Sequence, residues 1–200
     1  MALSSLDVAY VVLSDLGWVC EWGLVAIAWL KRHKRHEDCR RWTYASLGVL
    51  LGSVLVLVVM KVASFDLDDP TSLRPASHKT TCGVFDFGAA PSSQPMAGYP
   101  SGHAYLTTLA TVLLVSFAHF EGTPWSWVTA SSVLTSLTLV ARRGLMCHTM
   151  LQLVDGVFLG ILVGACVIAI AYAPRDPQPS VEMTTVTEDS SLHQPISGPP

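Results

Sequence analysis

Two short polar segments interrupt an otherwise apolar chain, and both carry residue types that can handle a phosphate group. One is Pro100–His103, with the sequence Pro-Ser-Gly-His, and the other runs from Arg142 to His148. Histidine can act as a nucleophile or as an acid near neutral pH, and arginine offers a planar fork of donors that matches phosphate oxygens. Phosphoryl transfer requires mainly that the protein position the reacting groups and place positive charge around the phosphoryl oxygens. The two segments together therefore predict a phosphate-handling site.

The segment Pro100–His103 has the features of an anion site at the start of a helix. Ser101 offers a hydroxyl, and no side chain obstructs the backbone N–H of Gly102. The helix expected to follow directs the positive end of its dipole to the same place. Lys61 and Arg74 are further cations that can supply charge around phosphoryl oxygens.

The composition predicts that these segments belong to a membrane protein. Half of the 200 residues are hydrophobic and 14% are charged, and the mean hydropathy is +0.45. Soluble domains carry about 25% charged residues. Five apolar stretches approach the roughly 20 residues needed to cross a bilayer, and they run about Val8–Leu30, Trp42–Phe65, Ala104–Phe120, Trp125–Val140 and Met150–Ala173. We therefore expect an all-α fold, a polytopic bundle of about five transmembrane helices that occupies residues 1–173.

The first and fourth stretches differ from the others. The segment Met1–Asp7 lacks a basic region and the apolar run after it is long, so we expect a retained helix, not a cleaved signal peptide. The fourth stretch is the least apolar because it contains six hydroxyl residues, Thr129, Ser131, Ser132, Thr135, Ser136 and Thr138. Small hydroxyl residues suit a helix that packs closely against others.

A basic loop predicts the orientation of the bundle. The segment Lys31–Arg41 holds six of the twelve Lys and Arg residues, which places it in the cytoplasm by the positive-inside rule. With five helices, the loop Asp66–Tyr99 and the turn Arg142–His148 then lie on the lumenal side, and Glu121–Pro124 lies in the cytoplasm. All candidate site residues thus fall on one side. The tail, Pro174–Pro200, is rich in Pro, Ser and Thr and is predicted to be disordered and cytoplasmic.

These residues resemble the type 2 phosphatidic acid phosphatase superfamily of lipid phosphate phosphatases, whose motifs are Lys-x6-Arg-Pro, Pro-Ser-Gly-His and Ser-Arg-x5-His-x3-Asp. The second motif is complete at Pro100–His103. The third keeps the spacing from Arg142 to His148, with Ala141 in place of Ser and Gln152 in place of Asp. The pattern His-Thr-x-x-Gln looks like the dolichyl-diphosphate phosphatase branch of the superfamily.

The first motif is incomplete. Arg74-Pro75 is present, but Leu67 stands where the family has Lys, and Lys61 is the nearest candidate. Lys61 is either a substrate ligand or an interfacial lysine that extends to the membrane surface. The resemblance covers roughly residues 61–164.

The resemblance implies a role for each matching residue. His148 would be the nucleophile that forms a phosphohistidine, and His103 would be the acid that protonates the leaving oxygen and later activates water. The phosphoryl oxygens would be held by Arg74, Arg142, Ser101 and the Gly102 amide, with Lys61 assisting. Gln152 lies four residues after His148, hence on the same helical face, and is expected to orient the His148 ring. Asp155 lies about 10 Å along the axis and is the alternative orienting residue only if the helix is irregular, because that distance is too far for direct contact in a regular helix.

The function implied is that of an integral membrane phosphatase that needs neither metal nor cofactor and acts on a lipid phosphate or diphosphate. Its site would face the lumen of the endoplasmic reticulum or another endomembrane. Dolichyl or another polyprenyl diphosphate is the expected substrate. The alternatives are phosphatidic acid or another lipid phosphomonoester, transfer of a phospho-headgroup to an alcohol, and a catalytically weak relative that serves as a membrane scaffold. The net charge of −3 gives no reason to expect nucleic acid as a partner.

Two acidic residues, Asp15 and Glu21, lie inside the first apolar stretch, where a charge is costly. Neither matches a family position. We therefore expect a satisfied, bundle-facing pair or protonated groups, and no catalytic role.

The five cysteines form no metal-binding pattern. Cys82 and Cys147 both fall on the predicted lumenal side, where a disulfide between them can form. Free cysteines are the more usual state and are what we expect here.

Overall fold

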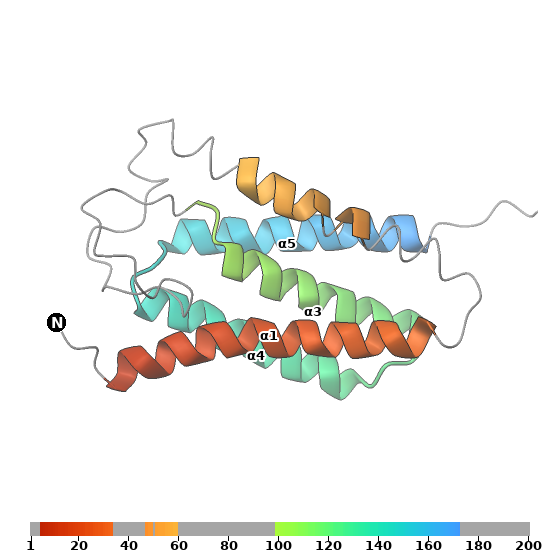
Figure 1. Cartoon of the computed structure of the whole chain (residues 1–200), viewed down its shortest axis with the longest axis horizontal. Coiled ribbons are helices and arrows are strands. Elements are labelled where there is room, and N and C mark those ends of the chain that lie inside the picture. The colour runs from red at the N-terminus through yellow and green to blue at the C-terminus, as the bar shows by residue number, and fades with distance from the viewer. Residues whose placement is uncertain (1–4, 34–46, 50, 60–98, 173–200) are drawn as a thin grey trace, which may run out of the picture.

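The computed structural model describes residues 5–33, 47–49, 51–59 and 99–172. Regular structure in these ranges is helical: α1 (Ser5–His33), α3 (Gly102–Glu121), α4 (Trp125–Gly144) and α5 (Met150–Ala171), with further helical residues at 47–49 and 51–59 (Figure 1). Within the described part of the chain, three helices are long and apolar enough to cross a membrane, over Val8–Arg32, Gly102–Glu121 and Met150–Ala171. The predicted all-α class is confirmed.

The helices follow the apolar stretches, with one informative difference at α4. That helix extends to Gly144, so Arg142 occupies its last turn. The expectation that Arg142 lies in a turn between helices is therefore wrong. A cation is favoured at this position because the last turn of a helix carries partial negative charge. Of the predicted helix 42–65, only residues 47–49 and 51–59 are described. The Lys31–Arg41 loop beyond His33, the 66–99 loop up to residue 98 and the tail after Ala173 lie outside the described residues.

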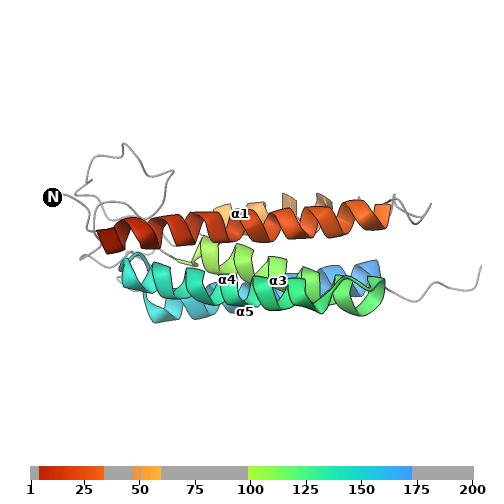
Figure 2. The same ribbon diagram turned by 90° about the horizontal axis from the view of Figure 1, so that it is seen from below.

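The helix α3 is the central element of the bundle. It packs against α1, α4 and α5. In Figure 1 α3 lies between α5 on one side and α1 and α4 on the other, and Figure 2 shows α1 along one side of the bundle. The main core is built around its buried side chains, among them Tyr105, Leu109, Leu114 and Phe117. Because α3 and α5 run in the same direction and α4 runs opposite to both, the starts of α3 and α5 lie at the same end as the end of α4.

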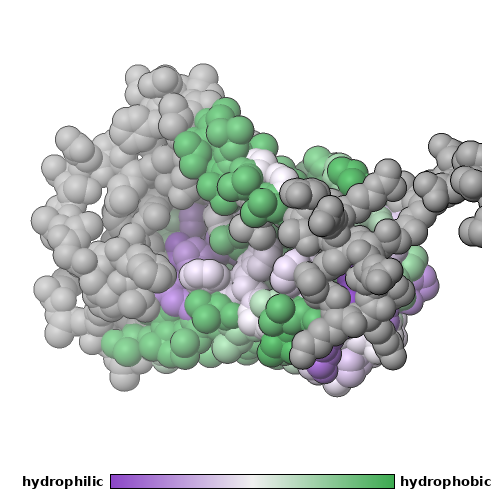
Figure 3. Space-filling model, turned by 45° about the vertical axis from the view of Figure 1, so that its right-hand side comes forward, coloured by the Kyte–Doolittle hydropathy of each residue, from purple (hydrophilic) through white to green (hydrophobic). Residues whose placement is uncertain are grey.

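The outer surface of the bundle is apolar. Large hydrophobic side chains are exposed on several helices, including Val8, Leu16, Leu51, Leu55, Phe158 and Ile170. Figure 3 shows two hydrophobic regions on one face, with hydrophilic residues between them. Extended apolar surface of this kind is unfavourable in water and matches the hydrocarbon of a bilayer.

Glycine allows α5 to approach α3 closely. A Cβ atom added at Gly156 would lie 2.6 Å from the backbone oxygen of Ser101, and one added at Gly160 would lie 2.8 Å from that of Tyr105. Both distances are shorter than a carbon and an oxygen tolerate, so any larger residue would force the helices apart. The close approach is what allows the start of α5 to contact the Pro-Ser-Gly-His segment.

The hydroxyl residues of α4 explain its low hydropathy. Ser131 and Thr135 face the bundle, where the Thr111 hydroxyl lies 2.7 Å from that of Ser131 and 3.0 Å from that of Thr135. The Thr135 hydroxyl also donates to the Glu21 carboxyl at 2.8 Å. The predicted close packing of α4 is thus present, and it joins α1, α3 and α4 through buried polar contacts.

A polar cluster fixes the opposite end of the bundle. Arg32 of α1 forms a 2.9 Å ion pair with Glu121 of α3. The Tyr172 hydroxyl, just after α5, accepts from Arg32 at 3.1 Å and donates to Glu121 at 3.1 Å. Burial and the Glu121 charge raise the pKa of Tyr172 above its ordinary value, which keeps the phenol protonated for this bond. Basic and aromatic residues of this kind are typical of a membrane interface.

Candidate active site

The two motif segments meet at one end of the bundle through the backbones of α3 and α5. The N–H of Ser101 donates to the carbonyl oxygen of Gln152 at 3.1 Å. The Ser101 hydroxyl caps α3 by accepting from the N–H of Ala104 at 3.4 Å. Ser101 therefore uses its backbone N–H and one lone pair for structure, and its hydroxyl hydrogen is the group that can serve an anion. At Gly102 the space beside the backbone is open.

A helix-ending turn places His148 beside Arg142. The N–H of Met146 donates to the carbonyl of Arg143 at 3.0 Å, and that of Cys147 donates to the carbonyl of Arg142 at 3.1 Å. These two bonds form a Schellman motif, in which one residue takes a left-handed conformation. That residue is Met146, with φ of 54°. The chain reverses there, and the residue after the turn, His148, comes back onto the last turn of α4.

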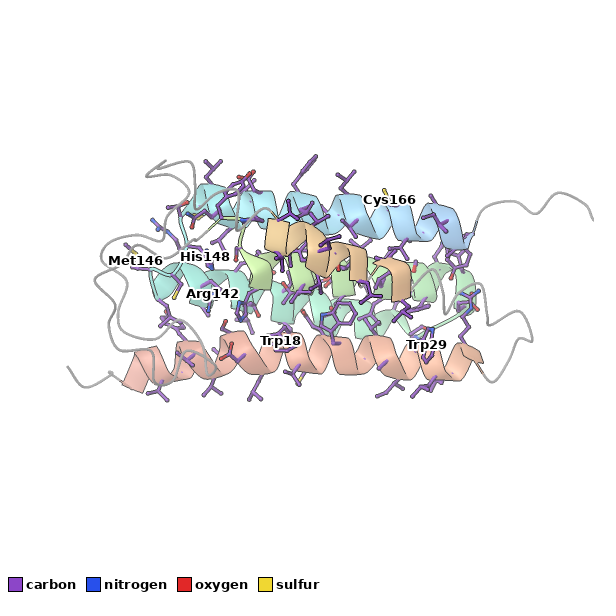
Figure 4. All side chains as sticks on the ribbon, turned by 45° about the horizontal axis from the view of Figure 1, so that its top comes forward. Trp18, Trp29, Arg142, Met146, His148 and Cys166 are labelled. Atoms are coloured by element: carbon purple, nitrogen blue, oxygen red, sulfur yellow. The ribbon has the colours of Figure 1, made fainter. Side chains whose placement is uncertain are left out.

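Arg142 and His148 form the buried centre of the site. Arg142 is 2% exposed and His148 is 3% exposed. The Arg142 Nη2 donates to His148 Nε2 at 3.2 Å, and Figure 4 shows the two side chains next to each other, with Met146 farther toward the end of the molecule. Since a guanidinium only donates hydrogen bonds, Nε2 must present its lone pair.

Gln152 fixes the same tautomer from the other side of the ring. Its Oε1 accepts the backbone N–H of Thr149 at 3.1 Å, which identifies this amide atom as the oxygen. The same Oε1 lies 3.3 Å from His148 Nδ1. An oxygen that only accepts requires Nδ1 to carry the hydrogen, so the neutral ring again has its lone pair at Nε2. The predicted contact between Gln152 and His148 is therefore present, but the expectation that both lie on one helical face is wrong, because His148 precedes the N-cap Thr149 and lies outside α5.

The Gln152 side chain is itself held by a capping box at the start of α5. The Thr149 hydroxyl accepts the backbone N–H of Gln152 at 3.3 Å, and Gln152 bonds back to the backbone of Thr149. This reciprocal pair is a common way to satisfy the first N–H groups of a helix. No role in the site is predicted for Thr149 from the sequence, although the spacing Thr-x-x-Gln is the signal that identifies such a cap.

His103 has a partner that the family pattern does not contain. Its Nε2 lies 3.0 Å from Oδ1 of Asp15, and the Asp15 side chain is only 8% exposed. Asp15 and Glu21 both face the bundle as expected, but each has its own contact on another helix. The signal for Asp15 was its acidic side chain within an apolar span, which by itself suggests a functional residue.

The expectation of free cysteines is wrong for Cys147, which is disulfide-bonded. The described residues Cys20 and Cys166 are free, so the partner of Cys147 lies outside the described residues, as does Cys82. Cys147 is fully buried beside Leu145 and Val11. The covalent link is placed directly before His148 and restrains the turn that positions it.

Two predicted phosphate ligands, Lys61 and Arg74, also lie outside the described residues. Asp155 contacts Tyr99, the residue before the Pro-Ser-Gly-His segment. Burial and the neighbouring carboxylate raise the pKa of Tyr99 above its ordinary value, so its phenol stays protonated and donates to Asp155. Within the described residues, no three His, Cys, Asp or Glu side chains gather as a metal site.

Comparison with protein-family models, with curated proteins and with solved structures finds no match to this chain. The relation to the lipid phosphate phosphatases therefore remains an interpretation of the motifs.

We expect Gln152→Ala to lower the turnover of the site's substrate about tenfold or more. The variant loses a hydrogen bond of about 0.5–1.5 kcal/mol and the fixed ring orientation that depends on it. Thr149→Ala is the matched control, because it removes the hydroxyl cap but keeps both acceptor contacts of Gln152 Oε1. Asp155→Ala should cost much less than Gln152→Ala. Steady-state kinetics of the three variants test the role of Gln152, and a Gln152→Ala enzyme with the rate of Thr149→Ala would contradict it.

Proposed function

We propose that this protein is a membrane phosphatase that hydrolyses a lipid phosphate or diphosphate through a phosphohistidine at His148. The observation that carries the proposal is the fixed tautomer of a buried histidine. Gln152 accepts from Nδ1, and Nε2 directs its lone pair at an arginine that is 3.2 Å away. A histidine nucleophile requires an available lone pair at one nitrogen and an orienting acceptor at the other.

The reaction divides into two half-reactions. In the first, Nε2 of His148 forms a bond to phosphorus, the bond to the leaving oxygen breaks, and that oxygen receives a proton from His103. In the second, a water oxygen bonds to phosphorus, the phosphorus–nitrogen bond breaks, and the water gives a proton to His103. Arg142 transfers its hydrogen bonds to the phosphoryl oxygens when substrate binds. There its positive charge stabilises the negative charge of these oxygens in the transition state.

A lipid substrate is supported by the place of the site in the bundle. The site lies at the end of helices whose outer faces carry exposed apolar side chains. A phosphorylated headgroup at that end can keep its hydrocarbon tail in the bilayer. The His-Thr-x-x-Gln pattern favours a polyprenyl diphosphate such as dolichyl diphosphate, and a phosphatidic acid is the next candidate.

The orientation we propose places the site in the lumen of an endomembrane, with the endoplasmic reticulum first among them. Lys31 and Arg32 lie at the end of α1 opposite to the site, at the start of the basic segment. Loops rich in Lys and Arg remain in the cytoplasm, so the site would lie on the other side.

A panel of lipid phosphates, assayed with purified protein in detergent without divalent metal, tests the function. We expect phosphate release from a polyprenyl diphosphate to be faster than from phosphatidic acid, with water as the only acceptor. Faster phosphate release from phosphatidic acid would show that the proposed substrate is wrong and that the proposed reaction is right. No release from any member of the panel would overturn the proposed function.

A further inference from the structure

We propose that Asp15 is a positioning residue that orients His103 and stabilises its protonated form. This inference rests on the proposed function. The observation behind it is the 3.0 Å contact between Asp15 Oδ1 and His103 Nε2, which joins α1 to the first turn of α3. The motifs of the resembled family contain no such residue.

The burial of Asp15 argues for a specific role. A carboxylate within an apolar helix is costly unless a partner offsets the loss of solvent. Here the Asp15 side chain is 8% exposed and the His103 side chain is 27% exposed, so the pair is sheltered on the carboxylate side and more open on the ring side. This arrangement suits a role in which the His103 ring exchanges protons with a substrate on its more open side.

The chemistry needed from His103 matches what a carboxylate provides. The ring must hold a proton until the leaving oxygen departs, and must regain one when water attacks. A carboxylate at Nε2 stabilises the positive ring in both steps and fixes its orientation. Because Nε2 is held by Asp15, the proton delivered to the leaving oxygen is the one on Nδ1. The two site histidines would then each have an orienting residue, an amide for the nucleophile His148 and a carboxylate for the acid His103.

The competing explanation is that Asp15 and His103 form a purely structural ion pair between α1 and α3. Two substrates that differ in their leaving group distinguish this explanation from a role in catalysis. A lipid monophosphate has an alkyl leaving group that needs a proton, whereas 2,4-dinitrophenyl phosphate has a leaving group that departs without one. The kcat/KM value reports the steps up to departure of that group. A residue that acts through the acid therefore affects the alkyl substrate selectively.

We expect Asp15→Asn to lower kcat/KM for the lipid monophosphate about 10- to 100-fold, and for dinitrophenyl phosphate less than about threefold. Glu21→Gln is the matched control, because Glu21 is a second buried acid on α1 that bonds to Thr135 and not to His103. Glu21→Gln should change kcat/KM by the same factor for both substrates. In a His103→Ala background, Asp15→Asn should have no further effect on the lipid substrate.

Equal losses on both substrates, or an additive effect in the His103→Ala background, would overturn this inference and leave the phosphatase proposal intact. If Asp15→Asn does not fold, Asp15→Glu provides the same test, since it keeps the charge but shifts the carboxylate by one methylene. Asp15→Glu should then lower kcat/KM for the lipid substrate alone. An equal loss for both substrates would count against a role through His103. A wild-type protein that hydrolyses neither substrate overturns the proposed function and this inference with it.

Discussion

His148→Ala is expected to lower the turnover of a polyprenyl diphosphate by about three orders of magnitude or more. The variant removes the only side chain proposed to form a bond to phosphorus, and what remains is binding and charge stabilisation by the rest of the site. Phosphate release by the purified variant measures the loss. His119→Ala is the matched control, because His119 is on α3 but exposed near the opposite end of the bundle. It should keep the wild-type rate.

A covalent intermediate provides an independent measurement of the same role. Brief incubation with substrate labelled in the terminal phosphate, followed by denaturation at alkaline pH, should leave label on the wild-type protein and on His119→Ala. No label should remain on His148→Ala. A His148→Ala protein that is labelled, or that turns over near the wild-type rate, would assign the nucleophile to another residue.

Much of the helical architecture could be predicted from local sequence. Apolar runs of about the length of a bilayer determine where α1, α3 and α5 lie, and the caps Ser101 and Thr149 determine where α3 and α5 begin. The contact between His148 and Gln152 is also local, because His148 directly precedes the Thr149–Gln152 capping box that holds the Gln152 side chain at the start of α5. Such features require no knowledge of how the helices pack.

The contacts between helices could not be predicted in the same way. The pairing of Asp15 with His103 depends on the rotation of α1 about its own axis, which the sequence of α1 alone does not determine. The same holds for the contact between Glu21 and Thr135. The close packing of α5 on α3 has a readable signal in the repeat of Gly156, Gly160 and Gly164 at intervals of four, but the repeat does not identify the partner helix.

The position of Arg142 shows how a motif can be recognised while its structural setting is missed. The apolar stretch Trp125–Val140 predicts a turn from Arg142 to His148. In the structure, α4 continues to Gly144 and a left-handed Met146 completes the reversal. Met has no preference for this conformation, which costs about 1–2 kcal/mol outside glycine. Rules that rely on glycine therefore predict a reversal in this segment but do not place it at Met146.

Arg142→Ala should lower kcat/KM for the lipid substrate about 1,000-fold. A buried guanidinium next to the nucleophile is expected to bind the equatorial oxygens of the phosphoryl group, and its loss removes both charge and directed hydrogen bonds from the transition state. Arg143→Ala is the matched control, since Arg143 is the next residue on the same helix turn but its side chain is exposed. It should stay within about twofold of the wild type, because an exposed charge contributes little.

Arg142→Lys separates the contribution of charge from that of geometry. Lysine keeps the positive charge but lacks the planar fork, so an intermediate loss of about 10- to 100-fold is expected. Inhibition by orthovanadate, a phosphate analogue, measures binding of the anion without turnover, and its inhibition constant should rise in the order wild type, Arg142→Lys, Arg142→Ala. Thermal melting in detergent checks that each variant is folded. An unchanged inhibition constant in folded Arg142→Ala would show that Arg142 only supports the His148 ring, and the phosphate-binding role would then pass to other cations of the chain.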